Sequence, residues 1–90
     1  MAIRVAMRYQ GTVQGVGFRA TVRSLASARP ISGLVRNEPD GSVWLEAQGM
    51  PSDVEAYLAE VAHALRTRIN TTHRHDMLPQ QDEQGFRIDR

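Results

Sequence analysis

The amino-acid sequence predicts an α+β fold, in which two helices cover one face of a mostly antiparallel sheet of four to five strands. Apolar and polar residues alternate in several short segments, as in strands with one buried face. In two longer segments the apolar residues recur at helical spacing instead. In chain order we expect a strand at 3–10, a helix at 18–29, strands at 31–36 and 42–48, a helix at 51–66 and a strand at 86–88.

The first strand and the first helix are each indicated by a clear pattern. In the strand, apolar residues from Ile3 to Tyr9 alternate with polar or small ones, which predicts one buried face. In the helix, Phe18, Val22 and Ala26 share one side, and Pro30 is expected to end it.

The middle of the chain predicts an antiparallel hairpin. Its two strands are separated by Glu38-Pro39-Asp40-Gly41, in which proline presets φ at one position and glycine accepts a positive φ at another. Trp44 alternates against Val43 and Leu45, so we expect its side chain to face away from the helices.

The second helix is expected to begin with a capping box formed by Ser52 and Glu55, with Asp53 near the positive end of its dipole. It is expected to end near Arg66 or Arg68. Residues 69–79 fit either a ragged strand or a loop, and a polar loop precedes the last strand. The order βαββαβ indicates the ferredoxin-like split βαβ architecture, which hosts many functions and so names none.

Composition narrows the possible functions. The 90 residues predict a single domain, 1–90, and a net charge of +1 predicts neither a nucleic-acid nor a membrane partner. No segment resembles a signal peptide or a membrane span, so we expect a cytoplasmic protein. The absence of cysteine and lysine excludes thiolate and Schiff-base chemistry and a Walker-type loop.

The segment 11–19, GTVQGVGFR, is the strongest candidate for a site. Gly15 and Gly17 allow a positive φ and leave backbone N–H groups open at the start of the first helix, where an anion is favoured. Arg19 can add two parallel hydrogen bonds to the same anion. The alternative is a tight turn with an exposed arginine, and the same choice applies to Asn37, which can hold a water or close a turn.

The wider pattern resembles the acylphosphatase family. The motifs that carry the resemblance are GTVQGVGFR at 11–19, GLVRN at 33–37 and DGSV at 40–43, supported by AQG at 47–49 and FRI at 86–88. Arg19 and Asn37 are also spaced as in that family. The resemblance is weak from residue 66 to 84, and Thr12 stands where relatives often carry a basic residue.

The resemblance implies an enzyme that hydrolyses the carboxyl-phosphate bond of acyl phosphates, with no metal or other cofactor. The loop amides would bind the phosphate, Arg19 would add its guanidinium, and Asn37 would orient the attacking water. By this resemblance the phosphate-binding residues are Gln14, Gly15, Val16, Gly17, Phe18 and Arg19, and the catalytic residues are Arg19 and Asn37. The partners would be a small acyl phosphate and the inorganic phosphate produced from it, and we expect a monomer.

Two other functions stay open. One is a non-catalytic anion-binding or interaction module of acylphosphatase-like fold, as found within larger hydrogenase-maturation proteins. The other is an RNA-binding or metal-carrying ferredoxin-like domain, which the absence of cysteine and of paired sheet aromatics disfavours. His73 and His75 would share a strand face, but without an evident third ligand we expect them to be surface histidines.

Overall fold

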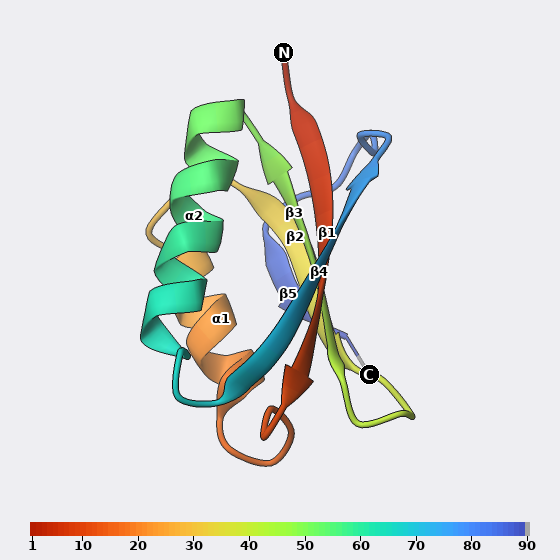
Figure 1. Ribbon diagram of the computed structural model, residues 1–90. Helices are drawn as coiled ribbons and strands as arrows, with labels where there is room; N and C mark the ends of the chain where they lie inside the picture. The colour runs from red at the N-terminus through yellow and green to blue at the C-terminus, as the bar shows by residue number, and fades with distance from the viewer. Residues whose placement is uncertain (90) are drawn as a thin grey trace.

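The computed structural model describes residues 1–89 and contains two helices and one five-stranded sheet (Figure 1). The elements are β1 (Ile3–Gly11), α1 (Phe18–Ala26), β2 (Ser32–Asn37), β3 (Val43–Gly49), α2 (Pro51–Ala64), β4 (Ile69–Met77) and β5 (Phe86–Ile88). The strands lie in the order β4-β1-β3-β2-β5, antiparallel except that β5 runs parallel to β2. The predicted fold class is confirmed, and residues 69–77 form a strand rather than a loop.

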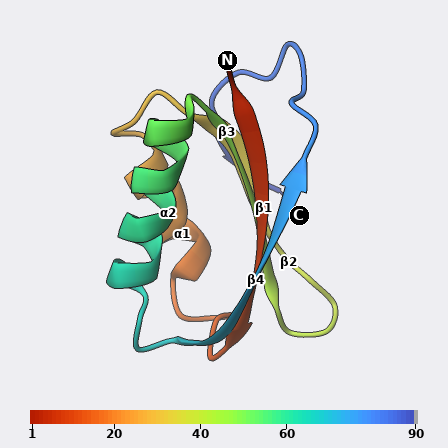
Figure 2. The same ribbon diagram turned by 45° about the horizontal axis from the view of Figure 1, so that its top comes forward.

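Both helices pack on the same face of the sheet, and the core lies between the two layers (Figure 2). Alternate residues of the strands and one side of each helix supply the buried side chains, as the periodicity predicts. Helix α2 contributes Val54, Tyr57, Leu58 and Val61. The Tyr57 hydroxyl donates a hydrogen bond of 2.8 Å to the Val22 carbonyl oxygen, which joins the two helices.

The expected boundaries of the helices need two corrections. Helix α1 ends at Ala26, and tight turns rather than helix lead to Pro30, because the residue before a proline is disfavoured in the α region. Helix α2 begins at Pro51 as expected, because the preset φ of proline suits the first helical position, but it ends at Ala64 rather than near Arg66 or Arg68. Ser52 therefore lies inside the first turn and forms no capping box.

Glu55, the other member of the expected capping box, has a different partner. Its carboxylate accepts two hydrogen bonds from the Arg74 guanidinium, at 2.8 and 2.7 Å. Arg74 lies on β4, so this ion pair links helix α2 to the edge strand of the sheet.

Strand β1 is buried on both faces near its start, whereas the sequence predicts one buried face. Arg4 is only 1% exposed on the side of the sheet away from the helices. Its guanidinium donates to Glu46 on β3 at 2.9 Å and to both carboxylate oxygens of Glu83 at 2.8 and 3.1 Å. Glu83 belongs to the segment between β4 and β5, which folds over this end of the sheet. The Ser32 hydroxyl also donates to Glu83, at 2.7 Å.

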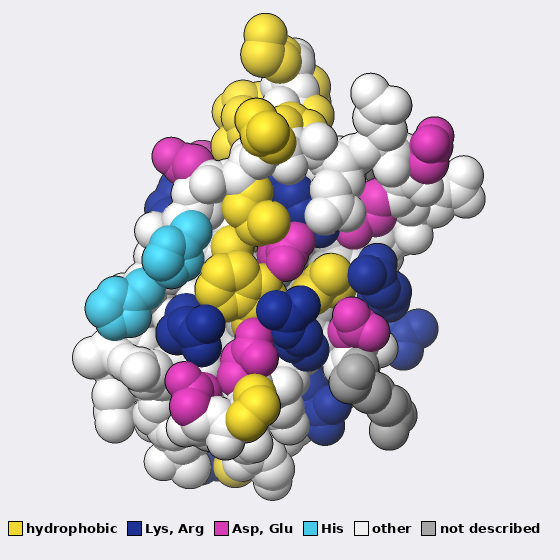
Figure 3. Space-filling view, turned by 90° about the vertical axis from the view of Figure 1, so that its right-hand side faces the viewer, with side chains coloured by type: hydrophobic (Ala, Val, Ile, Leu, Met, Phe, Trp, Pro, Cys, Tyr) yellow, Lys and Arg dark blue, Asp and Glu magenta, His cyan; other side chains and the backbone are white. Residues whose placement is uncertain are grey.

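The outer face of the sheet carries side chains of both charges (Figure 3). Trp44 faces outward as expected: the Arg8 and Arg36 guanidinium carbons lie 5.1 and 5.7 Å from its ring centroid. The ring of His75 stacks on it at 5.7 Å, and His73 is exposed. Acidic groups are interspersed among these cations, so the face does not form the one-sign surface typical of nucleic-acid binding.

The ion pair between Arg4 and Glu83 predicts acid-sensitive stability. The hydrogen bonds from Arg4 lower the pKa of Glu83, so its stabilising effect is present above the unfolded-state pKa of about 4.3 and is lost as pH falls further. Glu83→Gln should lower the free energy of unfolding at pH 7 by about 3 kcal/mol, because Arg4 loses a buried partner. Urea denaturation from pH 7 to pH 3 should show a smaller acid-dependent loss in Glu83→Gln than in the wild type.

The matched control is Glu60→Gln, which removes a half-exposed carboxylate that is 3.4 Å from Arg29. Its effect on stability should be small at every pH. Equal acid dependence in the wild type and in Glu83→Gln would contradict the assignment.

Candidate functional site

The loop that joins β1 to α1 depends on two glycines. Gly15 and Gly17 have φ values of 75° and 77°, in the left-handed region that side chains other than glycine rarely adopt. A Cβ atom at either position would meet no atom within 4 Å. Backbone conformation rather than crowding therefore requires glycine here, and the space beside both residues is open.

The N-terminus of helix α1 is open to an anion. Gly17 is its N-cap, so no side chain caps the helix, and the first turn contains no acidic residue. The first backbone bond of the helix runs from the Thr21 N–H to the Gly17 carbonyl oxygen. The amides of residues 18–20 precede this bond and lie at the positive end of the helix dipole.

The Gln14 side chain joins this loop to the turn between β2 and β3. Its amide nitrogen donates to the Glu38 carbonyl oxygen at 2.8 Å and to the Ser42 carbonyl oxygen at 2.9 Å. An amide NH₂ group has two donors, and both are used. The Gly41 N–H also donates to Glu38, and the Asp40 carboxylate accepts from Ser42, so the turn itself is closed.

The hydrophobic core anchors the loop from below. Phe18 is 1% exposed, and its ring centroid lies 5.4 Å from that of Tyr9 on β1. Val13 is buried as well, and Val16 packs against the core. The side chain of Phe18 is therefore structural, and only its backbone is available to a ligand.

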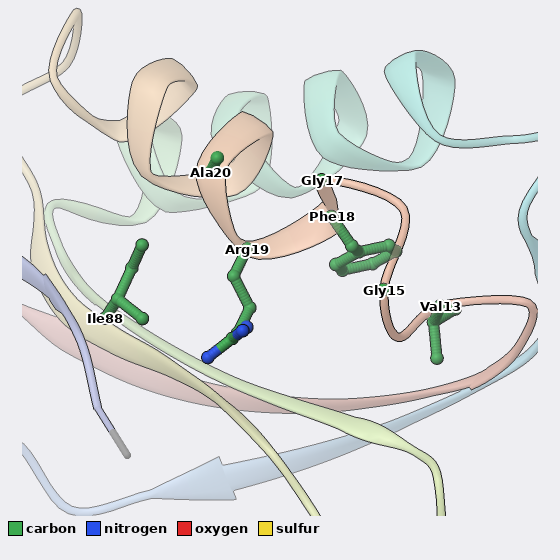
Figure 4. Close-up of a pocket in the computed structure, with 7 residues that line it drawn as sticks. All are labelled: Val13, Gly15, Gly17, Phe18, Arg19, Ala20 and Ile88. Atoms are coloured by element: carbon green, nitrogen blue, oxygen red, sulfur yellow. The ribbon is translucent and has the colours of Figure 1, made fainter.

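Arg19 extends from the first turn of α1 into a pocket of about 170 Å³ (Figure 4). Among residues 1–89 its guanidinium has no hydrogen-bond or ion-pair partner. The pocket is lined by Val13, Gly15, Gly17, Phe18, Arg19, Ala20 and Ile88. It therefore combines one free guanidinium with the backbone of the glycine loop.

Asn37 lies at the end of β2, immediately before Glu38, to which Gln14 is bonded. The structure thus brings the loop next to the residue that follows Asn37, although Asn37 itself does not line the pocket. Its Oδ1 atom is buried and has no hydrogen-bond partner within the described part of the chain. A buried amide oxygen without a partner is costly, so this atom is suited to a bound water or ligand.

Two features of the site were missed by sequence reasoning. The first is the role of the Gln14 side chain, which no local pattern indicates because both of its acceptors lie more than twenty residues away. The second is Ile88, which reaches the pocket from the last strand. The alternation of Ile88 with Arg87 in the sequence could have indicated that Ile88 faces the helices. It could not have indicated that Ile88 lies beside Arg19.

The chemistry available here is that of an anion site. The pocket offers backbone amides and one guanidinium, and none of its lining residues is acidic. Residues 1–89 contain no group of three or more histidine, aspartate or glutamate side chains that could hold a metal ion. No helix within that range is long and apolar enough to cross a membrane.

Comparison with known proteins identifies related sequences. Residues 5–88 match the family model described as acylphosphatase. The acylphosphatase of Geobacillus thermodenitrificans is 38% identical over 86 residues, which cover 94% of this chain and 92% of that protein. The acylphosphatase of Oceanobacillus iheyensis is 49% identical over 57 residues, and that of Salinibacter ruber 52% identical over 60 residues. These last two matches span 63% and 62% of the respective relatives.

Solved structures with the same fold include two kinds of protein. The crystal structure of acylphosphatase from Bacillus subtilis superposes with a TM-score of 0.86 at 24% identity, covering 100% of both chains. The HypF protein of T. kodakarensis superposes with a TM-score of 0.84 at 26% identity. That match covers 98% of this chain but 12% of HypF, so the fold occurs both alone and within a longer protein.

The hydrogen bonds that join Gln14 to the turn between β2 and β3 can be tested by replacing the donating NH₂ group of its side chain with an acceptor. In Gln14→Glu a carboxylate oxygen would face the carbonyl oxygens of Glu38 and Ser42 in place of the donating NH₂ group. We expect a loss of about 1–3 kcal/mol in the free energy of unfolding, measured by urea denaturation. Backbone amides of the loop at Gly15 and Gly17 should also exchange faster with solvent.

Gln84→Glu is the matched control, since it makes the same chemical change at an exposed residue. It should leave stability and loop exchange close to those of the wild type. Identical behaviour of the two variants would refute the structural role of Gln14.

Proposed function

Because the chain belongs to the acylphosphatase family, we propose that it hydrolyses acyl phosphates to a carboxylate and inorganic phosphate. The observation that carries the proposal is the uncapped start of α1 beside the Arg19 guanidinium, which has no partner among residues 1–89. Amides and guanidinium together suit a phosphoryl group, whose oxygens accept several hydrogen bonds at once.

In the proposed reaction, the backbone amides of residues 14–19 and the Arg19 guanidinium hold the phosphoryl oxygens. Water attacks phosphorus on the side opposite the acyl oxygen, and the bond between phosphorus and that oxygen breaks. The carboxylate leaves with the bonding electron pair. Both protons of the water stay at first on the phosphate product, which then equilibrates with solvent. The transition state is loose, so positioning and charge stabilisation provide most of the catalysis.

This reaction needs few protein groups. The leaving carboxylate is a weak base, so no general acid has to protonate it. No acidic residue lines the pocket, and none is required in this scheme. Chemistry of this kind is within reach of a chain that has neither cysteine nor lysine.

We assign the attacking water to Asn37. Its amide can accept a hydrogen bond from water at Oδ1 and donate one through Nδ2. The support is the buried Oδ1, which has no partner among residues 1–89, at a strand end that Gln14 links to the phosphate-binding loop. Gln14 is a positioning residue in this scheme, because its side chain holds the loop and touches no substrate.

A second candidate function is a non-catalytic anion-binding module. The observation that favours it is the likeness to HypF, in which the same fold is a small part of a longer chain. Such a module would bind phosphate at the same loop and release none from an acyl phosphate.

The decisive assay is release of phosphate from benzoyl phosphate in the presence of EDTA, which the wild type should perform without added metal. Arg19→Ala and Asn37→Ala should each lower kcat by about a hundredfold to a thousandfold, since each removes a contact to the reacting groups. Circular dichroism and thermal unfolding should show that both variants remain folded.

Exposed residues of the same types provide the controls. Arg66→Ala and Asn70→Ala should retain wild-type kcat. Full activity in Arg19→Ala or in Asn37→Ala would remove that residue from the mechanism. Phosphate binding without hydrolysis of any acyl phosphate would instead establish the non-catalytic module.

A further inference from the structure

A second pocket lies along the groove between α1 and β5. It has a volume of about 330 Å³ and is lined by Arg23, Ala26, Ser27, Arg29, Ile31, Gly85 and Phe86. The same two elements, α1 and β5, also border the pocket of Arg19. The groove therefore contains two pockets, and only the first belongs to the phosphate site proposed above.

The spacing of residues shows that the two pockets are neighbours. Arg19 and Arg23 are four residues apart on α1, so they lie on the same face of the helix about 6 Å apart along its axis. Ile88 and Phe86 are two residues apart on β5, so they share a face at a separation of about 6.6 Å. A ligand whose phosphoryl group is held at Arg19 can thus extend along the groove toward Arg23.

The lining of the second pocket suits a particular chemical group. Its floor is apolar, with Ala26 and Ile31 buried and Phe86 half-buried. At its edge, the Arg23 guanidinium has no carboxylate partner anywhere in residues 1–89. Arg29, by contrast, is already 3.4 Å from the Glu60 carboxylate. The pocket therefore offers an apolar surface that ends in one free cation.

We propose that this second pocket, the acyl subsite, binds the acyl group of the substrate, and that Arg23 selects acyl phosphates with a carboxylate at the far end of that group. The proposal rests on the proposed function. A single guanidinium can bind a carboxylate through two parallel hydrogen bonds, and the apolar floor covers the carbon skeleton between the two charged ends. The axial rise of about 6 Å between the two arginine positions is comparable to the length of a benzoyl group.

Two rigid substrates of similar shape test this selectivity: 4-carboxybenzoyl phosphate and 4-methylbenzoyl phosphate. The wild type should favour the carboxylated substrate by about tenfold in kcat/KM, the effect of one charge-assisted hydrogen-bonded pair at a partly exposed site. Arg23→Gln should remove this preference, and Arg23→Glu should reverse it. Arg66→Gln, which neutralises an exposed arginine outside the groove, should keep the preference of the wild type.

Inhibition by inorganic phosphate separates the subsite from the phosphate pocket. In Arg23→Gln the inhibition constant should change far less than the preference does. A wild type without preference, or a preference that persists in Arg23→Gln, would overturn the acyl subsite and leave the proposed function intact. Equal losses on both substrates together with weakened phosphate inhibition would overturn the selective role of Arg23. Hydrolysis of benzoyl phosphate but of neither 4-substituted substrate would overturn the acyl subsite alone. Failure of the wild type to hydrolyse any of the three would overturn the proposed function and the acyl subsite together.

Discussion

The two hydrogen bonds donated by the Gln14 side chain hold together parts of the candidate site that come from distant segments. One part is the glycine loop at the start of α1, and the other is the turn that follows Asn37. Gly15 and Gly17 give the loop its shape, but a glycine loop has high conformational entropy and needs attachment to keep one conformation. The Gln14 amide attaches the loop to the turn between β2 and β3, and the Phe18 ring attaches it to the core through its contact with Tyr9.

The arginines of this chain serve two different purposes. Arg4 is buried with carboxylates on both sides, where it ties the segment between β4 and β5 to the outer face of the sheet. Arg74 joins α2 to β4 in the same way at the surface. Arg19 and Arg23, on one face of α1, have no such carboxylate partner among residues 1–89. A guanidinium that no carboxylate of residues 1–89 neutralises is available to a ligand, and both of these face the groove beside β5.

Sequence reasoning succeeded where the signal is local. The order of the elements other than β4, the turn at residues 38–41 and the outward-facing Trp44 all followed from periodicity and backbone preferences. It failed at helix ends, where Met50 rather than Ser52 is the N-cap of α2, because several local signals compete within a few residues. It also missed the burial of Arg4, since that depends on Glu83, a residue 79 positions away.

For the candidate site, the sequence by itself determined which residue types are present and where the chain can adopt a left-handed backbone. It also placed Arg19 in the first turn of a helix, because helix periodicity and glycine conformation are local properties. Only the tertiary structure decided that Gln14 bonds to the turn after Asn37 and that Ile88 borders the Arg19 pocket. It also decided that the Asn37 oxygen is buried with no partner in the described part of the chain. These contacts depend on which strands are neighbours, and strand order results from packing of the whole chain rather than from any one segment.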